Sequence, residues 1–206
     1  MTPTATSTLR NEHEAILKML DATDEVAKQI ECGSVPEPEI LSGLLEFLRL
    51  FADRCHHGKE EDLLFPMLEK KGLPRQGGPI AVMLMEHDQG RALIRKMAEA
   101  AEAFAAGDAI AAKRWAAPAQ GYTQLLRSHI DKENNILFVM AEQLLSDAEQ
   151  SELSVAFEKV ELEKMGAGTH ERLHKLMDSL CSRIFSEAQT NKVSSQIHDG
   201  FGVRPA

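Results

Sequence analysis

The chain has 206 residues, of which 43 % are hydrophobic, 27 % charged and only 5 % aromatic, and its formal net charge is −9. This length suffices for one domain with a sizeable core, or for a domain with an appendage. The negative charge argues against nucleic acid or an anionic membrane as the main partner, and no window approaches the roughly 20 apolar residues of a membrane span.

Four long amphipathic helices are predicted over the first three quarters of the chain. Apolar residues recur with helical periodicity over residues 7–31, 38–71, 80–106 and 108–145. Short segments rich in Gly and Pro separate them. Long helices joined by short loops are typical of an up-down-up-down bundle, so we expect an all-α fold.

The last quarter of the chain predicts two further helices, over residues 149–164 and 170–187. The apolar stripe of the second helix indicates that it packs on the bundle. We therefore expect a four-helix bundle over residues 7–147, a C-terminal helical extension over 148–188 and a mobile tail over 189–206.

An internal repeat selects the first candidate ligands. Residues 55–69, CHHGKEEDLLFPMLE, align with residues 128–142, SHIDKENNILFVMAE, with seven of fifteen positions identical. This register places His56 on His129 and Glu60 on Glu133, whereas placing His57 on His129 leaves two identities in fifteen. The repeat therefore favours the pair His56 and Glu60.

A competing pair with the same spacing, His57 and Glu61, lies one residue further along. Helical residues four apart share a face, and the face of His56 is otherwise apolar. The face of His57 also carries Asp53 and Arg54, which is typical of a solvated boundary. We expect His57 and Glu61 to lie at that boundary or to support the ligands.

The repeat extends towards the N-terminus. Glu12-His13-Glu14 resembles Glu86-His87-Asp88, and the distance from His13 to His56 is 43 residues against 42 from His87 to His129. Two such halves would close with pseudo-two-fold symmetry and turn four imidazoles and two carboxylates inward. The predicted metal ligands are His13, His56, Glu60, His87, His129 and Glu133.

This ligand set predicts two metal ions that share the two carboxylates, each ion taking two imidazoles. Nitrogen and oxygen ligands without thiolate, and with open positions, favour iron over structural zinc, although manganese or zinc could also occupy such a site. Ferritin-like bundles use Glu-x-x-His, whereas here His precedes Glu by four residues, which excludes that class.

These motifs resemble those of the hemerythrin-like proteins, also called HHE cation-binding domains. The resemblance covers about residues 7–147 and is carried by His13, the segment 56–66, His87 and the segment 129–133. It implies a non-haem di-iron centre, compatible with an oxo bridge, in a four-helix bundle that handles oxygen, nitric oxide or peroxide.

The sequence departs from the oxygen-carrying members at two positions. Arg91 stands where those members have a fifth His, and Asn134 stands where they have Asp. The pattern is closer to bacterial members linked to nitrosative or oxidative stress and to repair of iron centres. The resemblance thus implies redox or iron-donating chemistry rather than oxygen transport.

Three functions are compatible with this pattern. The first is a stress protein that binds or reduces a small diatomic or peroxide ligand at two iron ions. The second is a redox or oxygen sensor that signals through the C-terminal extension, and the third is an iron store or donor. Whether the protein is an enzyme, and its oligomeric state, stay open.

Other candidate residues are weaker. Tyr122 precedes His129 by two helical turns, so we expect it to pack in the core, the alternative being a phenol that approaches the metal. His170 and His174 lack a matching carboxylate, which favours a cap over a second metal site. The chain has three cysteines, an odd number, and they lie far apart in the sequence: Cys32, Cys55 and Cys181. This favours reduced thiols, and the N-terminal segment lacks a hydrophobic signal region, so we expect a cytoplasmic protein.

Overall fold

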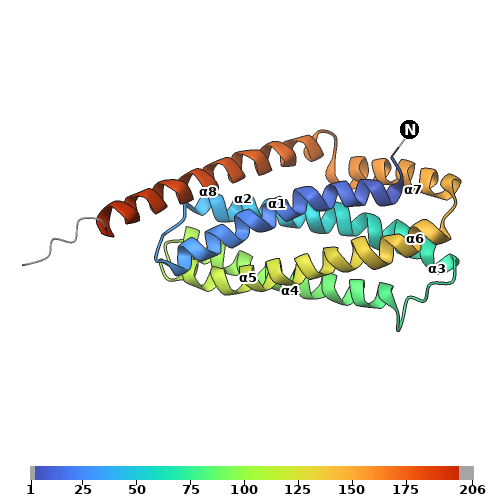
Figure 1. The fold of residues 1–206 in the computed structure, drawn as a ribbon, viewed down its shortest axis with the longest axis horizontal. Coiled ribbons are helices and arrows are strands. Elements are labelled where there is room, and N and C mark those ends of the chain that lie inside the picture. The colour runs from blue at the N-terminus through green and yellow to red at the C-terminus, as the bar shows by residue number, and fades with distance from the viewer. Residues whose placement is uncertain (1–2, 200–206) are drawn as a thin grey trace, which may run out of the picture.

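The computed structural model describes residues 3–199 and shows an antiparallel helical bundle covered on one side by the C-terminal helices (Figure 1). No strand occurs among these residues, so the all-α prediction is confirmed. The bundle helices are α1 (Ala5–Glu31), the run α2 (Pro38–Phe47), η1 (Leu48–His57), η2 (Glu60–Leu64) and α3 (Phe65–Lys70), α4 (Pro79–Ala105), and the run α5 (Ala111–Lys132), η3 (Glu133–Leu137) and α6 (Phe138–Leu144).

The bundle helices end at residues that stop a helix for known reasons. Gly72 and Gly107 follow the second and third helices with φ of +96° and +102°, a conformation that glycine adopts without the penalty of a Cβ atom. Pro79 starts α4, where its missing N–H has no helical partner to lose. These residues mark where the second and third helices end and where α4 begins.

Two helices change from α to π hydrogen bonding at the same point of the repeat. The N–H of Phe65 donates to the carbonyl of Glu60, and the N–H of Phe138 donates to the carbonyl of Glu133, five residues back in both cases. A longer π segment, η1, ends at His57. Such segments are rare and occur frequently at functional sites.

The apolar core forms two clusters, one at each end of the bundle. One cluster contains Leu20, Phe47 and Trp115, and the other contains Leu9 and Phe138. On the first three helices of the bundle, the predicted ligands lie between the residues of the two clusters. On the fourth helix Glu133 does so, and His129 directly precedes Ile130, the last residue of that helix in the first cluster. The fold therefore encloses the polar residues in the middle of an apolar bundle.

The C-terminal helices are α7 (Asp147–Val160), η4 (Glu161–Met165) and α8 (Thr169–Asp199). Helix α7 packs on α1, and α8 packs along α1 and α2 (Figure 1). Close packing is possible because Gly43 has no side chain: a Cβ there would lie 3.1 Å from Cδ1 of Leu180. Helix α8 continues to Asp199, and of the expected mobile tail over 189–206, residues 200–206 lie outside the described residues.

Candidate metal centre

The six predicted ligands meet in the middle of the bundle, and all are buried. Their exposed fractions do not exceed 1 %. Charged and ionisable groups are almost never buried in this way unless they are paired or bind a metal. The six residues are His13, His56, Glu60, His87, His129 and Glu133.

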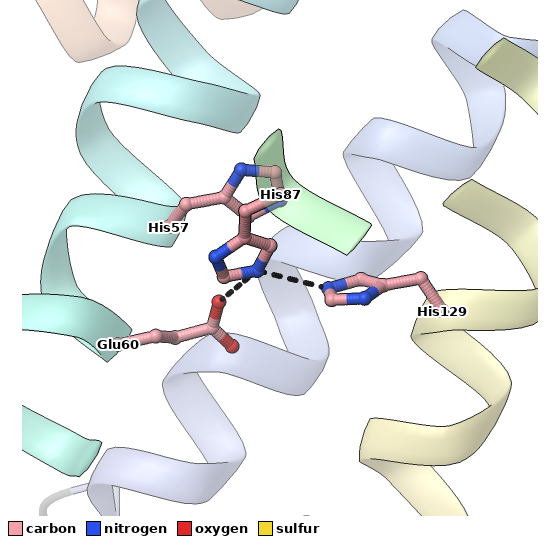
Figure 2. A group of neighbouring side chains, drawn as sticks. All are labelled: His57, Glu60, His87 and His129. Atoms are coloured by element: carbon pink, nitrogen blue, oxygen red, sulfur yellow. Dashed lines mark hydrogen bonds and ion pairs between the residues drawn. The ribbon is translucent and has the colours of Figure 1, made fainter. Parts of the chain in front are cut away.

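Their donor atoms form two neighbouring groups, each of four atoms within 4.8 Å of one another. One group joins His13 and His56 to Glu60 and Glu133. The other group, drawn in Figure 2, joins His57, His87 and His129 to Glu60. The sequence predicted two imidazoles on each side, so the second group contains one histidine, His57, more than predicted.

Both glutamates turn one oxygen to each side of the centre. Oε2 of Glu133 lies 3.2 Å from Nε2 of His13, and Oε1 lies 3.2 Å from Nε2 of His129. Oε1 of Glu60 lies 3.5 Å from Nε2 of His56, and Oε2 lies 3.5 Å from Nε2 of His87. Each carboxylate therefore faces imidazole nitrogens on both sides of the centre.

The buried polar atoms of the centre need partners that the described protein atoms do not provide. Nε2 of His13, Nε2 of His56 and all four carboxylate oxygens of Glu60 and Glu133 have no hydrogen-bond partner within the described part of the chain. An unpaired buried polar group costs about 1–3 kcal/mol, and more if it is charged. Cations bound between these atoms would remove that cost, so the residues fit a metal centre.

One outer carboxylate orients His56. Nδ1 of His56 lies 2.8 Å from Oε2 of Glu12. Burial alone would raise the pKa of Glu12, but hydrogen bonds from His56 and Lys59 outweigh it and hold that pKa at about 2. A carboxylate only accepts, so Nδ1 of His56 carries the proton and Nε2 keeps its lone pair for a metal.

The second half of the bundle repeats this arrangement. Nδ1 of His129 lies 3.0 Å from Oε2 of Glu86, and Nζ of Lys132 donates to the other oxygen of Glu86. Glu86 is thus the counterpart of Glu12, and Lys132 is the counterpart of Lys59.

The other two predicted histidines also have outer partners at equivalent positions. Nδ1 of His13 lies 2.9 Å from Oδ1 of Asn134, and Nδ1 of His87 lies 2.7 Å from Oε1 of Glu61. Asn134 aligns with Glu61 in the repeat, because the two are 73 residues apart, as are His56 and His129. Arg91, at the position of the missing fifth His, donates to Glu61 at 2.7 Å.

Electrostatics keeps two of the imidazoles neutral. Burial lowers the pKa of His56 to about 4, even though Glu12 opposes the change. Burial, reinforced by His87 and His129, lowers the pKa of His57 well below its usual value. Neutral imidazole is the form that binds a metal. Burial and the nearby charge of Glu133 raise the pKa of Glu60, which shows how unfavourable two carboxylates are there without a cation.

The expectation of a solvated boundary at His57 is wrong, because only 4 % of this residue is exposed. Its ring stacks on the ring of His87, with centroids 3.8 Å apart and planes 17° apart. The expectation assumed regular α periodicity, whereas His57 ends the π segment η1, in which each turn takes more residues. The adjacent histidines, His56 and His57, can then both turn inward.

The weaker candidates are also placed. Tyr122 is buried, its ring packs against Gly90, and its hydroxyl has no hydrogen-bond partner among the described residues. Burial, and to a smaller extent the charge of Asp53, raises the pKa of Tyr122. Packing thus accounts for the ring but leaves the hydroxyl unexplained.

His170 approaches Glu12 and Glu161 closely enough for the three to hold a cation. However, Nζ of the buried Lys59 already donates to both of these carboxylates. The ammonium group of Lys59 thus balances the charge of the two carboxylates. His170 and His174 lie beside the ring of Phe51 and contribute to the packing of α8.

No described helix is long and apolar enough to cross a membrane.

Comparison with known proteins agrees with this centre. The family described as hemerythrin HHE cation binding domain matches residues 4–141. The iron-sulfur cluster repair protein YtfE of Salmonella schwarzengrund is 33 % identical over 121 residues, which cover 56 % of this chain and 54 % of that protein. The uncharacterized protein Rv1995 of Mycobacterium tuberculosis is 25 % identical over 176 residues, 85 % of this chain and 68 % of that protein.

The chain spans about half of the length of the Salmonella relative. The family match, in contrast, includes all four helices of the bundle and every predicted ligand. The sequence resemblance is therefore confirmed: the chain belongs to the hemerythrin HHE cation-binding domain family.

Proposed function

We propose that the chain binds two iron ions and uses them to bind or reduce a small oxidant, namely oxygen, peroxide or nitric oxide, in a stress response. The imidazoles of His13 and His56 would hold one ion and those of His87 and His129 the other. Glu60 and Glu133 would bridge the ions. The observation that carries this proposal is that each of these glutamates turns one oxygen to each side of the centre, at 3.2 Å or 3.5 Å from an imidazole nitrogen.

Bound iron would supply the redox chemistry, and the chain's own residues would control access and proton positions. Glu12 and Glu86 accept the Nδ1 protons of His56 and His129, which fixes the nitrogen that each ring presents. The apolar clusters on both sides of the centre limit the entry of water and favour small, weakly polar molecules. This environment supports a diatomic or peroxide ligand over a larger polar substrate.

The relatives support a stress-related role for the iron. The Salmonella protein is named for repair of iron-sulfur clusters, and we propose that this chain handles iron in a related setting. Its three cysteines are free thiols, which supports a reducing, cytoplasmic compartment. Donation of iron to another protein stays an alternative to redox chemistry with a small ligand.

A specific contact favours sensing as a second candidate function. Glu161 of the C-terminal extension pairs with Lys59, Lys59 pairs with Glu12, and Glu12 holds His56. A change at the metal ions could therefore reach η4 and α8 through three adjacent contacts. The described part of the chain offers no comparable contact from the extension to Lys132.

The test is to load the protein with iron, add peroxide or nitric oxide, and follow the absorption spectrum and the loss of peroxide. The proposal predicts a spectral change that scales with bound iron and is absent from Glu60→Ala treated in the same way. No reaction with either compound would contradict it. If peroxide is not consumed but amide exchange in residues 161–185 changes with oxidation, the sensor function is favoured.

A further inference from the structure

We propose that His57 is a seventh ligand, which binds the same metal ion as His87 and His129 and makes the two metal positions unequal. This inference rests on the proposed function, since it concerns how the iron ions are held. It departs from the repeat, which supplies only two imidazoles to each position.

The ring of His57 lies beside the other residues of this donor group. A nitrogen of His57 lies within 4.8 Å of the donor atoms of Glu60, His87 and His129, so one cation could touch all four. Besides stacking on His87, the ring meets that of His129 edge-on, with centroids 5.6 Å apart. In Figure 2 the ring of His57 lies over that of His87, whose Nε2 faces Glu60 and His129.

Two ring nitrogens that face each other in this group require a positive charge between them. Nε2 of His87 and Nε2 of His129 lie 3.1 Å apart. Both rings have Nδ1 next to a carboxylate, that of Glu61 or Glu86, so in the neutral rings both Nε2 atoms present lone pairs to each other. A cation or a proton must lie between them, and a metal ion there could also be bound by His57.

His57 also has the outer partner that the other four imidazoles have. Its Nδ1 lies 3.4 Å from Oδ1 of Asp53, and Asp53 is fixed by Nε of Arg91 at 2.8 Å. A carboxylate behind one ring nitrogen is the usual support of a metal-bound histidine, because it orients the ring and leaves the second nitrogen for the metal. Arg91, which replaces the missing fifth His, thus helps to place a histidine from another helix.

The asymmetry follows from the alignment of the two halves. His57 aligns with Ile130, which is 3 % exposed and belongs to the apolar core. One metal position is thus flanked by His57, His87 and His129, and the other only by His13 and His56. Two ions in these positions would differ in ligand number.

The variant that tests this is His57→Ile, because it gives the first half the side chain that the second half already has at Ile130. His174→Ala serves as the matched control, since His174 belongs to neither group of donor atoms. Each protein is loaded with iron, oxidised and compared by Mössbauer spectroscopy and by the rate at which a chelator removes the iron.

In wild type and His174→Ala we expect two unequal iron signals of similar intensity. In His57→Ile we expect the two signals to converge, and one of the two ions to leave at least about tenfold faster, the lower end of what loss of a supporting residue costs. The metal-free His57→Ile protein should melt no lower than the metal-free wild type, since isoleucine replaces a buried neutral imidazole. If it does melt lower, His57→Gln is measured in its place against the same expectations.

Unchanged iron signals and unchanged release rates in the variant would overturn the role of His57 and leave the proposed function intact. Wild-type protein that retains no iron after loading would overturn both.

Discussion

Nδ1 of His56 donates a hydrogen bond to Oε2 of Glu12 over 2.8 Å, and this contact fixes the ring nitrogen that His56 presents to the centre. The same contact recurs between His129 and Glu86 over 3.0 Å. The two histidines are 73 residues apart and the two glutamates 74. The duplication therefore includes the carboxylates that orient the predicted ligands.

The first prediction concerns Glu12. In Glu12→Gln the amide oxygen can still accept from His56, but the negative charge that strengthens the imidazole as a ligand is lost. We expect iron affinity to fall by about 10–100-fold, the usual effect of changing such a partner, as measured by competition with a chelator. Glu14→Gln is the control, because Glu14 is exposed two residues away. Equal losses in the two variants would contradict the role of Glu12.

The second prediction separates two adjacent glutamates. Glu60→Ala removes a carboxylate that faces both metal positions, so iron content should fall from about two ions per chain to near zero by metal analysis. Glu61→Ala removes the partner of Nδ1 of His87 and of Arg91, but no group that faces both metal positions, so most iron should remain, although it is held more weakly. Equal loss of iron from both variants would contradict the prediction that Glu60, unlike Glu61, binds both ions.

The third prediction concerns Lys59, which is fully buried and pairs with Glu12 and Glu161. Lys59→Ala leaves the carboxylate of Glu12 buried and without its ammonium partner, which should lower the free energy of unfolding by about 3–5 kcal/mol. Glu161→Gln should have a smaller effect, since Lys59 keeps Glu12 and Glu161 is partly exposed.

The control for this pair is Glu163→Gln, from the same segment η4, which among the described residues pairs with the exposed Lys159. It should change stability by no more than about 0.5 kcal/mol in denaturant unfolding. A Glu161→Gln protein as stable as Glu163→Gln would show that the contact between extension and centre contributes nothing.

Much of the fold and of the centre could be predicted from the sequence, because both depend on local periodicity and on the duplication. The helix boundaries follow from Gly72, Gly107 and Pro79, and the register of the repeat selects His56 and Glu60. Glu12 and Glu86 directly precede predicted ligands in the sequence, but their role needs the structure, since acidic residues follow the same ligands. Glu14 and Asp88, which have the same kind of position, are exposed.

The buried, inward position of His57 could not be predicted, because the face expected for it depends on regular α-helical rotation. The change to π hydrogen bonding in η1 cannot be recognised from the spacing of apolar residues in the sequence. The link from Lys59 to Glu161 was missed for a related reason: it joins residues 102 positions apart through the docking of the extension.

The fourth prediction concerns the hydroxyl of Tyr122. A phenolate bound to ferric iron gives a visible charge-transfer band, whereas a packed phenol does not. Because burial raises the pKa of this phenol and its ring packs on Gly90, we expect Tyr122→Phe to retain the iron and the visible spectrum of the wild type. Loss of a visible band at unchanged iron content would identify Tyr122 as a ligand instead.

The most direct test of two ions bridged by Glu60 and Glu133 is an anomalous-scattering map of iron-loaded crystals. We expect two peaks, each within bonding distance of one oxygen from each glutamate. One should lie on the side of His13 and His56, and the other on the side of His87 and His129. A single peak, or a peak at Glu12, Glu161 and His170 in place of this pair, would contradict it.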